Sequence, residues 1–269
     1  MSGRVFVVGS LNIDTVHTVP AHPRVGETIH AVTTTTMPGG KGGNQAVAAA
    51  AAGAPTTMVG AVGDDGGRYL EHLGRAGVDT SGVRRAAGLA TGAATVIVNV
   101  EGDNSIIVTY GANGAVSADQ LAAITLRPDD VVSLQFELRD DVLRAAATWA
   151  KEAGATLIVN PSPWRAGLDA VLALCDLVIA NELEATDLPA AVPTDRICLT
   201  LGGDGARWGD LSAPAPAIDP VDTTGAGDAF AGTLSARLAL GSPRAAALRE
   251  AVAAASELCL RHGAQQWRS

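Results

Sequence analysis

The feature of the sequence that most limits its fold is the regular alternation of short apolar runs with longer alanine-rich stretches. Several of the runs are apolar at every position, as strands of a parallel sheet with both faces covered are. The alternation therefore predicts an α/β fold with a central, mostly parallel sheet and helices on both of its faces. The predicted strands are Val5–Gly9, Thr56–Val62, Val131–Phe136, Thr156–Asn160, Leu177–Ala180 and Ile197–Leu201.

Two of the intervening helices have recognisable ends. Asp140 is placed to cap a helix over Asp141–Ala153, because an aspartate before a helix accepts hydrogen bonds from its first free N–H groups. Ser242 and Pro243 form a cap followed by a first-turn proline, and they predict a last helix that runs to Gly263.

Two stretches interrupt the alternation. Residues 12–36 are rich in threonine and valine and carry no helix signal, and Ala93–Tyr110 has the alternating pattern of a hairpin that turns at Glu101–Asn104. We expect the two stretches to form one small β-sheet that stands off the main sheet, as a lid built from about 12–37 and 91–111. Nothing in the pattern indicates a second domain, so 1–269 is expected to be one α/β domain.

Composition excludes several classes of function. The 269 residues include 28 acidic and 19 basic side chains, and the net charge of −9 argues against a nucleic-acid partner. No apolar run approaches the roughly twenty residues of a membrane span, so no membrane partner is expected. The three scattered cysteines and the lack of a signal-peptide pattern at the start predict a cytoplasmic protein.

The strongest chemical signal is the stretch from Val221 to Phe230, VDTTGAGDAF, where glycines precede a helix. Gly225 and Gly227 allow close approach of a ligand, and the free N–H groups at a helix start attract an anion. Asp228 has two interpretations, an ordinary acidic residue of the first turn or a general base beside a phosphate site. The two flanking glycines favour the base, because a simple helix cap does not need them.

Two further motifs indicate a polyhydroxylated ligand. Residues 38–46, PGGKGGNQA, place four glycines around Lys41 before an alanine-rich helix, and this is not a phosphate-binding Walker loop. Asn12 and Asp14 follow the first strand, and they face the same side if the chain is extended. A local turn stabilised by these two side chains is an equally good interpretation of that pair.

Taken together, the motifs resemble the PfkB family of carbohydrate kinases, and within it the ribokinase branch, over nearly the whole chain. They occur in the family's order: GSLNID (9–14), PGGKGGNQAVAAA (38–50), VGDDGG (62–67), GANGAVS (111–117), NPSP (160–163), NELEA (181–185), LTLGGDGA (199–206) and DTTGAGDAF (222–230). The resemblance implies a ribokinase-like fold and ATP-dependent phosphorylation of a sugar's primary hydroxyl, with D-ribose converted to D-ribose 5-phosphate. A kinase for another small sugar or a nucleoside, and a sugar-sensing protein with impaired catalysis, stay open as alternatives.

The resemblance also implies roles for individual residues. Asp228 is the catalytic base, and the backbone of Gly225, Ala226 and Gly227 forms the anion hole. The positions implied to contact the sugar, besides Asp228, are Asn12, Asp14, Gly40, Lys41, Asn44 and Glu137. The positions implied to contact ATP are Asn181, Thr200, Gly202, Gly203, Gly205 and Gly227, and Glu184 is implied to hold Mg²⁺ through water.

Several features of the family are altered or remain open. The segment between Glu184 and Ile197 is too short and proline-broken for the helix that relatives carry there. The implied monovalent-cation site uses Asp222, Thr224 and Gly263, but Trp267 stands where relatives place a ligating serine, so activation by K⁺ is in question. Family members commonly pair through their lids, and a homodimer is expected here.

Overall fold

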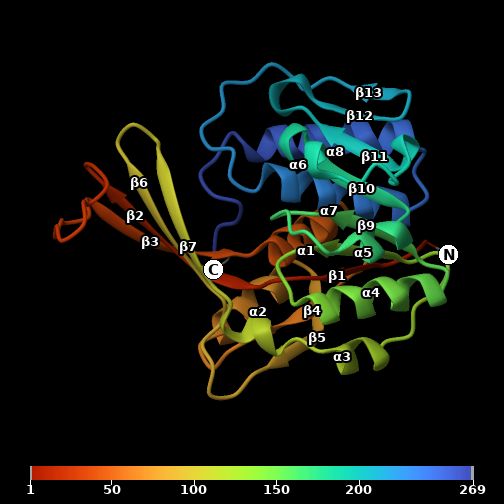
Figure 1. The fold of residues 1–269 in the computed structure, drawn as a ribbon, viewed down its shortest axis with the longest axis horizontal. Helices are drawn as coiled ribbons and strands as arrows, with labels where there is room; N and C mark the ends of the chain where they lie inside the picture. Colours follow the sequence, from red (N-terminus) through yellow and green to blue (C-terminus); the bar gives the residue numbers. More distant parts are fainter. Residues whose placement is uncertain (1, 268–269) are drawn as a thin grey trace.

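Seven parallel strands form the centre of a nine-stranded sheet in the computed structural model, which describes residues 2–267 (Figure 1). The sheet has the order β13-β12-β11-β10-β9-β8-β1-β4-β5, and β12 and β13 add a short antiparallel hairpin at one edge. The strands are β1 (Val5–Val8), β4 (Thr56–Val62), β5 (Val78–Arg85), β8 (Val131–Gln135), β9 (Thr156–Asn160), β10 (Leu177–Asn181), β11 (Ile197–Thr200), β12 (Ala206–Trp208) and β13 (Leu211–Ala213). The expected α/β architecture is confirmed.

Helices cover both faces of this sheet, because successive strand side chains point to opposite sides. In β1, Val5 and Val7 belong to one apolar core, and Phe6 and Val8 belong to the other. The first core is covered by α1 (Lys41–Ala51), α2 (Gly67–Arg75), α7 (Ala226–Ala239) and α8 (Arg244–Leu258). The second is covered by α3 (Ala118–Ala122), α4 (Asp140–Glu152), α5 (Asp169–Leu174) and α6 (Glu182–Asp187).

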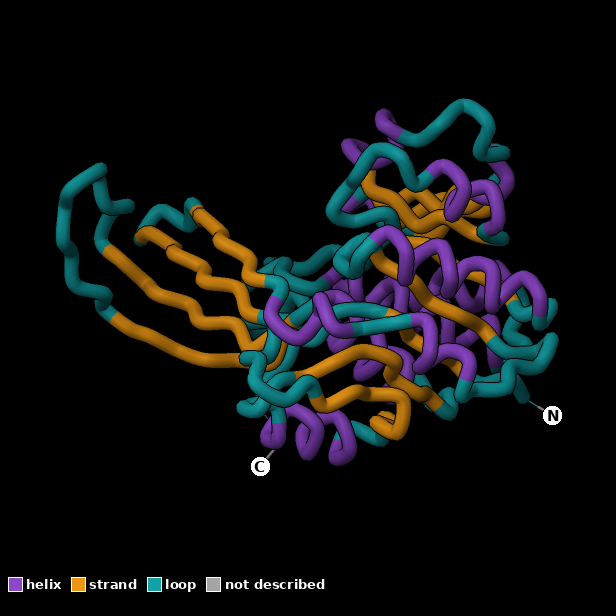
Figure 2. The backbone as a smooth tube through the Cα atoms, turned by 60° about the horizontal axis from the view of Figure 1, so that its bottom comes forward, coloured by secondary structure: helices purple, strands orange, loops and turns teal. Residues whose placement is uncertain are grey.

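A separate four-stranded sheet stands out from the main body, as the views in Figures 1 and 2 both show. It consists of β2 (Asn12–Val19), β3 (Thr33–Gly39), β6 (Ala93–Asn99) and β7 (Asn104–Thr109), in the order β3-β2-β6-β7. The β2–β6 pair is parallel and the two outer pairs are antiparallel. The two stretches that interrupt the sequence pattern therefore pair with each other, as expected.

Two details of the helix predictions are wrong. Helix α4 already includes Asp140, and the capping position is taken by Arg139, with no side-chain cap. Helix α8 begins at Arg244 with Pro243 at the capping position, one residue later than the predicted cap at Ser242, and it ends at Leu258, since Cys259 to Arg261 form turns. The short segment after Glu184 contains only the rest of α6 and a 3₁₀ turn at Thr194–Arg196, in agreement with its length and its prolines.

The parallel strands bring distant loops to one edge. The chain leaves β1, β8, β10 and β11 at their carboxyl ends on the same side, which is where open α/β sheets bind ligands. The small sheet begins at this edge, because β2 follows β1 after three residues. Among residues 2–267, no helix has the length and apolar character needed to span a membrane.

Candidate active site

Asp228 lies in the first turn of α7, whose N-cap residue, Gly225, has the left-handed φ of 78° that favours glycine. The carboxylate is buried, with 5% of the residue exposed, and both of its oxygens accept hydrogen bonds from α1. Asn44 Nδ2 donates to Oδ2 at 2.9 Å, and Gln45 Nε2 donates to Oδ1 at 3.1 Å. The aspartate at the helix start is thus held in one orientation by two amides.

Asn12 and Asp14, the first two polar residues of β2, are held by hydrogen bonds from neighbouring segments. Asn113 Nδ2 donates to Asn12 Oδ1 at 2.9 Å, and the backbone N–H of Ala94 in β6 donates to Asp14 Oδ1 at 2.9 Å. Burial raises the pKa of Asp14 to about 6; the Ala94 hydrogen bond opposes this rise, and the nearby charge of Glu137 adds to it. Asp14 therefore keeps its proton to a higher pH than an ordinary aspartate does.

The glycine loop before α1 joins these residues to Glu137. Lys41 N donates to Glu137 Oε2 at 3.0 Å, and the Ser10 hydroxyl donates to the same oxygen. Gly40 has a φ of 82°, and a Cβ there would lie 2.9 Å from backbone atoms of Ser10 and Asn12, so only glycine fits without strain. The charge of Asp228 raises the pKa of the Lys41 ammonium; burial opposes the rise, and the charges of Glu137 and Glu184 assist it.

All seven residues predicted to face the sugar thus come together around the amino end of α1. Four partners were missed by sequence reasoning: Ser10, Gln45, Asn113 and Gln265. Gln265 Nε2 donates to Asn44 Oδ1 at 2.6 Å, and its Oε1 lies 2.8 Å from His72 Nε2. Ser10, Gln45 and Asn113 lie inside the motifs, but nothing in the sequence identifies the hydrogen-bond partner of a buried polar side chain.

The residues predicted to contact ATP line a single cavity of about 600 Å³. Asn181, Thr200, Gly202, Gly203, Gly205 and Gly227 all belong to its wall. The remaining wall is mostly apolar and comes largely from the loop after β13, from α7 and from α8 with its C-cap; it includes Pro216, Ile218, Phe230, Val252 and Cys259. Since Ala226 and Gly227 also line it, the cavity reaches the amino end of α7 beside Asp228.

Asn181 and Glu184 form a reciprocal capping box at the start of α6. Glu184 N donates to Asn181 Oδ1 at 2.8 Å, and Asn181 N donates to Glu184 Oε2 at 3.0 Å. No group of three metal-ligating side chains occurs within residues 2–267. A lone carboxylate with free lone pairs suits Mg²⁺ bound through water, because this ion keeps several waters and takes phosphate oxygens as ligands.

Asp222, Thr224 and Gly263 also meet. The backbone N–H groups of Thr224 and Gly263 each donate to the Asp222 carboxylate at 2.8 Å. Burial raises the pKa of this carboxyl, but the hydrogen bonds from Thr224 and Gly263 outweigh burial and lower it. The side chain of Trp267 does not join this group, since its Nε1 donates to Thr36 O of β3 at 2.8 Å.

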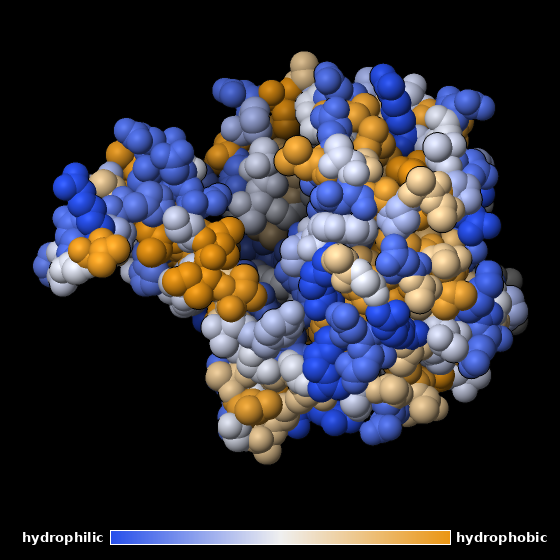
Figure 3. All heavy atoms as spheres, in the orientation of Figure 1, coloured by the Kyte–Doolittle hydropathy of each residue, from blue (hydrophilic) through white to orange (hydrophobic). Residues whose placement is uncertain are grey.

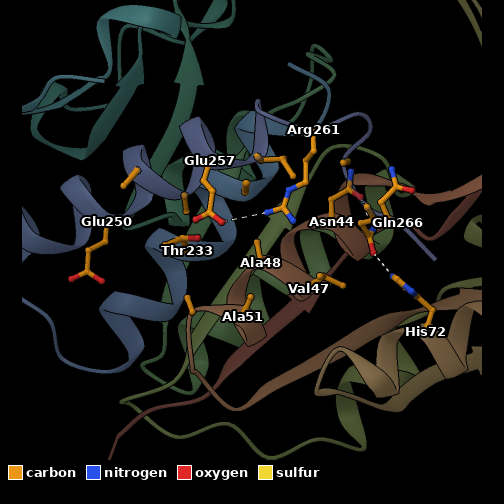
Figure 4. A pocket seen from close by; sticks show the side chains of 18 of the residues that line it. Asn44, Val47, Ala48, Ala51, His72, Thr233, Glu250, Glu257, Arg261 and Gln266 are labelled. Carbon is orange, nitrogen blue, oxygen red and sulfur yellow. Dashed lines mark hydrogen bonds and ion pairs between the residues drawn. The ribbon is translucent and has the colours of Figure 1, made fainter. Parts of the chain in front are cut away.

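A second cavity, of about 750 Å³, lies behind the site between α1, α7, α8 and the tail at 264–267. Figure 4 shows it with Asn44 and His72 at one end and Glu250 at the other. Much of its wall is alanine, and an ion pair between Arg261 and Glu257, with 3.7 Å between Nη2 and Oε1, lies along one side of it.

Comparison with known proteins defines the class to which this fold and site belong. The sequence model of the pfkB family of carbohydrate kinases matches residues 2–268, and the chain belongs to that family. Within the family it is similar to ribokinases. The chain is 35% identical to the ribokinase of Bacillus subtilis (strain 168) over 277 residues, which cover 97% of this chain and 94% of the Bacillus protein.

Two further proteins similar to this chain are also ribokinases. The ribokinase of Mus musculus is 35% identical over 263 residues, which cover 87% of this chain and 81% of the mouse protein. The structure of Arabidopsis thaliana ribokinase complexed with ribose and ATP superposes with a TM-score of 0.87 at 31% identity, covering 98% of this chain and 94% of that one. The ribokinase-like fold and the carbohydrate kinase class are thereby confirmed.

Proposed function

We propose that the chain transfers the γ-phosphoryl group of ATP to the primary hydroxyl of D-ribose and forms D-ribose 5-phosphate. The observation that carries the proposal is the position of Asp228. Its buried carboxylate lies between the polar side chains around α1 and the cavity lined by the glycines of the predicted nucleotide loop. A hydroxyl held on one side and a phosphate on the other meet at that carboxylate.

In this mechanism the sugar binds to Asn12, Asp14, Glu137 and the segment from Gly40 to Asn44, which forms the N-cap and first turn of α1. Asp228 accepts the proton of the hydroxyl as its oxygen attacks the γ-phosphorus in line, and the bond from phosphorus to the ADP oxygen breaks. The backbone N–H groups of Gly225–Gly227 stabilise the charge on the transferring group. Mg²⁺ bound through Glu184 and water would supply further neutralisation of the phosphates.

The small sheet serves as the lid over the sugar in this proposal. Its support is the hydrogen bond from Ala94 of β6 to Asp14 of β2, which joins the two lid segments, about 12–37 and 91–111, at a residue proposed to hold the sugar. A closed lid excludes water, and exclusion of water suppresses hydrolysis of ATP.

Pairing of two chains through the lid is part of the proposal. Strand β7 forms an edge of the small sheet, and its Ile106, Ile107 and Val108 are 55%, 65% and 59% exposed. Figure 3 shows apolar residues gathered on the small sheet. Exposed apolar edge strands favour pairing with another chain, and a homodimer would cover them.

The cytoplasm is the proposed location, in keeping with three free, buried cysteines at Cys175, Cys198 and Cys259. Weak activation by K⁺ at Asp222, Thr224 and Gly263 completes the proposal, since the side chain of Trp267 offers no oxygen to such an ion.

A substrate panel tests the function. Ribose, 2-deoxyribose, other small sugars and nucleosides are each mixed with ATP and Mg²⁺, and coupled ADP release is measured with and without K⁺. We expect ribose to give the highest kcat/KM. A preference for a nucleoside or another sugar would overturn the ribose assignment, and ribose binding by calorimetry without ADP release would indicate the impaired sensor.

A further inference from the structure

We propose that Gln45 is a positioning residue that holds Asp228 in its reactive orientation, as the outer member of a buried amide relay that starts on strand β8. The inference rests on the proposed role of Asp228 as the base. Gln45 itself is fully buried, so its role is indirect. Its side chain bridges the central sheet and the amino end of α7.

The relay has only one consistent hydrogen-bond direction. A carboxylate only accepts hydrogen bonds, so Gln45 must present its amide nitrogen to Asp228 and its oxygen to the sheet. That oxygen accepts from Ser133 Oγ at 2.8 Å and from Gln135 Nε2 at 2.6 Å. Ser133 and Gln135 are two apart on β8 and therefore share the face that meets α1. The carboxylate of Asp228 therefore fixes which way the Gln45 amide faces, and the hydrogen bonds from Ser133 and Gln135 hold that amide against Asp228.

The environment of Gln135 indicates that these buried amides do more than fill space in the core. The residue is fully buried, and for its Oε1 no hydrogen-bond partner occurs among residues 2–267. A buried carbonyl without a partner is unfavourable, and an apolar residue on β8 would avoid that cost. The strand nevertheless carries an amide whose nitrogen points to Gln45, which is what orientation of a charged group requires.

The packing of α7 against α1 is adapted to this contact. Gly232 lies one turn after Asp228 on the same face of α7. A Cβ at Gly232 would come within 2.3 Å of Gln45 O and 2.8 Å of the Ala48 Cβ. The missing side chain lets the backbone of α1 approach closely enough for Gln45 to reach the carboxylate.

The experiment measures kcat and KM for ribose, at saturating ATP and Mg²⁺, in two variants of the full chain. Gln45→Met removes the amide, and we expect kcat to fall by about 10- to 100-fold, the scale of a 1 Å misplacement, with KM changed little. Gln45→Glu keeps the shape and still accepts from Ser133 and Gln135, but it replaces the N–H donor by a like charge. A role in packing alone predicts nearly normal kcat for Gln45→Glu, whereas the relay predicts a loss at least as large as that of Gln45→Met.

Two further variants serve as controls. Gln120→Met removes an amide that donates to Gly60 O at 2.8 Å and Gly82 O at 3.0 Å on the other face of the sheet, so stability falls but kcat should not. Ser133→Ala leaves one of the two donors to Gln45 and should cost only a few-fold in kcat. Melting temperatures of all variants separate loss of folding from loss of catalysis.

The Asp228→Asn background separates this inference from the function on which it rests. Gln45→Met should cause no additional loss there, because the group that it orients no longer acts as a base. Full activity in Gln45→Glu, or an equal loss from Gln45→Met in both backgrounds, would overturn the role of Gln45 and leave the kinase assignment intact. Unchanged turnover in Asp228→Asn itself would overturn the proposed mechanism instead.

Discussion

The candidate site has two halves, one proposed for the sugar and one for the nucleotide, and they differ in the kinds of residue that line them. The proposed sugar half consists of buried and half-buried polar side chains held by other polar groups, as in the contacts of Asn12 with the Asn113 side chain and of Glu137 with the backbone N–H of Lys41. The nucleotide half is a cavity of glycines, prolines and apolar side chains. In the proposed function, side-chain chemistry selects the sugar that accepts the phosphoryl group, whereas backbone shape holds the ATP that donates it. An acidic chain can therefore hold a polyphosphate without a cluster of basic residues.

The largest effect is expected where the two halves meet. Asp228→Asn keeps the shape of the side chain but removes the base, so kcat should fall by about 10²- to 10⁴-fold. Calorimetry should find ribose and ADP bound nearly as in the parent protein, since each half is otherwise intact. If turnover is unchanged, Asp228 does not join the two halves chemically.

Within the sugar half, pH should act through Asp14. A carboxyl group with a pKa of about 6 is mostly ionised at pH 7 and mostly protonated at pH 5. An ionised carboxylate is the better acceptor for sugar hydroxyls, so in the proposed site KM for ribose should rise about tenfold as the pH falls from 7 to 5. KM for ATP measured over the same range provides the contrast between the halves.

Asp14→Asn is the matched control for this pH dependence. Its amide does not titrate, so KM for ribose should be raised at every pH and should no longer change between pH 7 and 5. A tenfold change that persists in Asp14→Asn would assign the titration to another group.

Within the nucleotide half, backbone shape should matter more than side-chain identity, and two neighbouring glycines test this. Gly205 has a φ of 95°, and a Cβ there would lie 2.0 Å from Ala213 O. Gly205→Ala is expected to lower the free energy of unfolding by about 1–3 kcal/mol and to raise KM for ATP. Gly203→Ala is the control, since nothing lies within 4 Å of its Cβ. Equal melting temperatures and KM values for the two variants would refute this interpretation.

The smallest effect is expected at the cation site. Replacing K⁺ by Na⁺ should change kcat/KM for ATP by less than about threefold, or about 0.6 kcal/mol, because Trp267 points away to Thr36. Initial rates at constant ionic strength measure this. Stimulation of tenfold or more would show that Asp222 and its neighbours bind the ion without a further side-chain ligand.

The sequence predicts the residues of the candidate site better than it predicts the residues that hydrogen-bond to them. Glycine-rich loops that follow apolar strands mark the sugar and nucleotide loops, because local backbone needs leave a local pattern. The partners of Asp228 are different, since Gln45 and Asp228 are 183 residues apart and only the packing of α1 on α7 joins them. The polar edge strand β5, Val78–Arg85, was missed for a related reason, because its run VDTSGVRR lacks the apolar signal of the inner strands.

The tail contacts have a consequence for the order in which the protein matures. Gln265 bonds to Asn44 across 221 positions of the chain, and Trp267 bonds to Thr36 across 231. A ribosome must therefore translate past Trp267 before Thr36 and Asn44 meet these partners. Chains still being synthesised should assemble the central sheet while staying inactive, and released chains ended at residue 260 should show the same deficit in a kinase assay. Long-range closure of this kind is slow relative to local structure, so activity should be the last property that the newly made protein acquires.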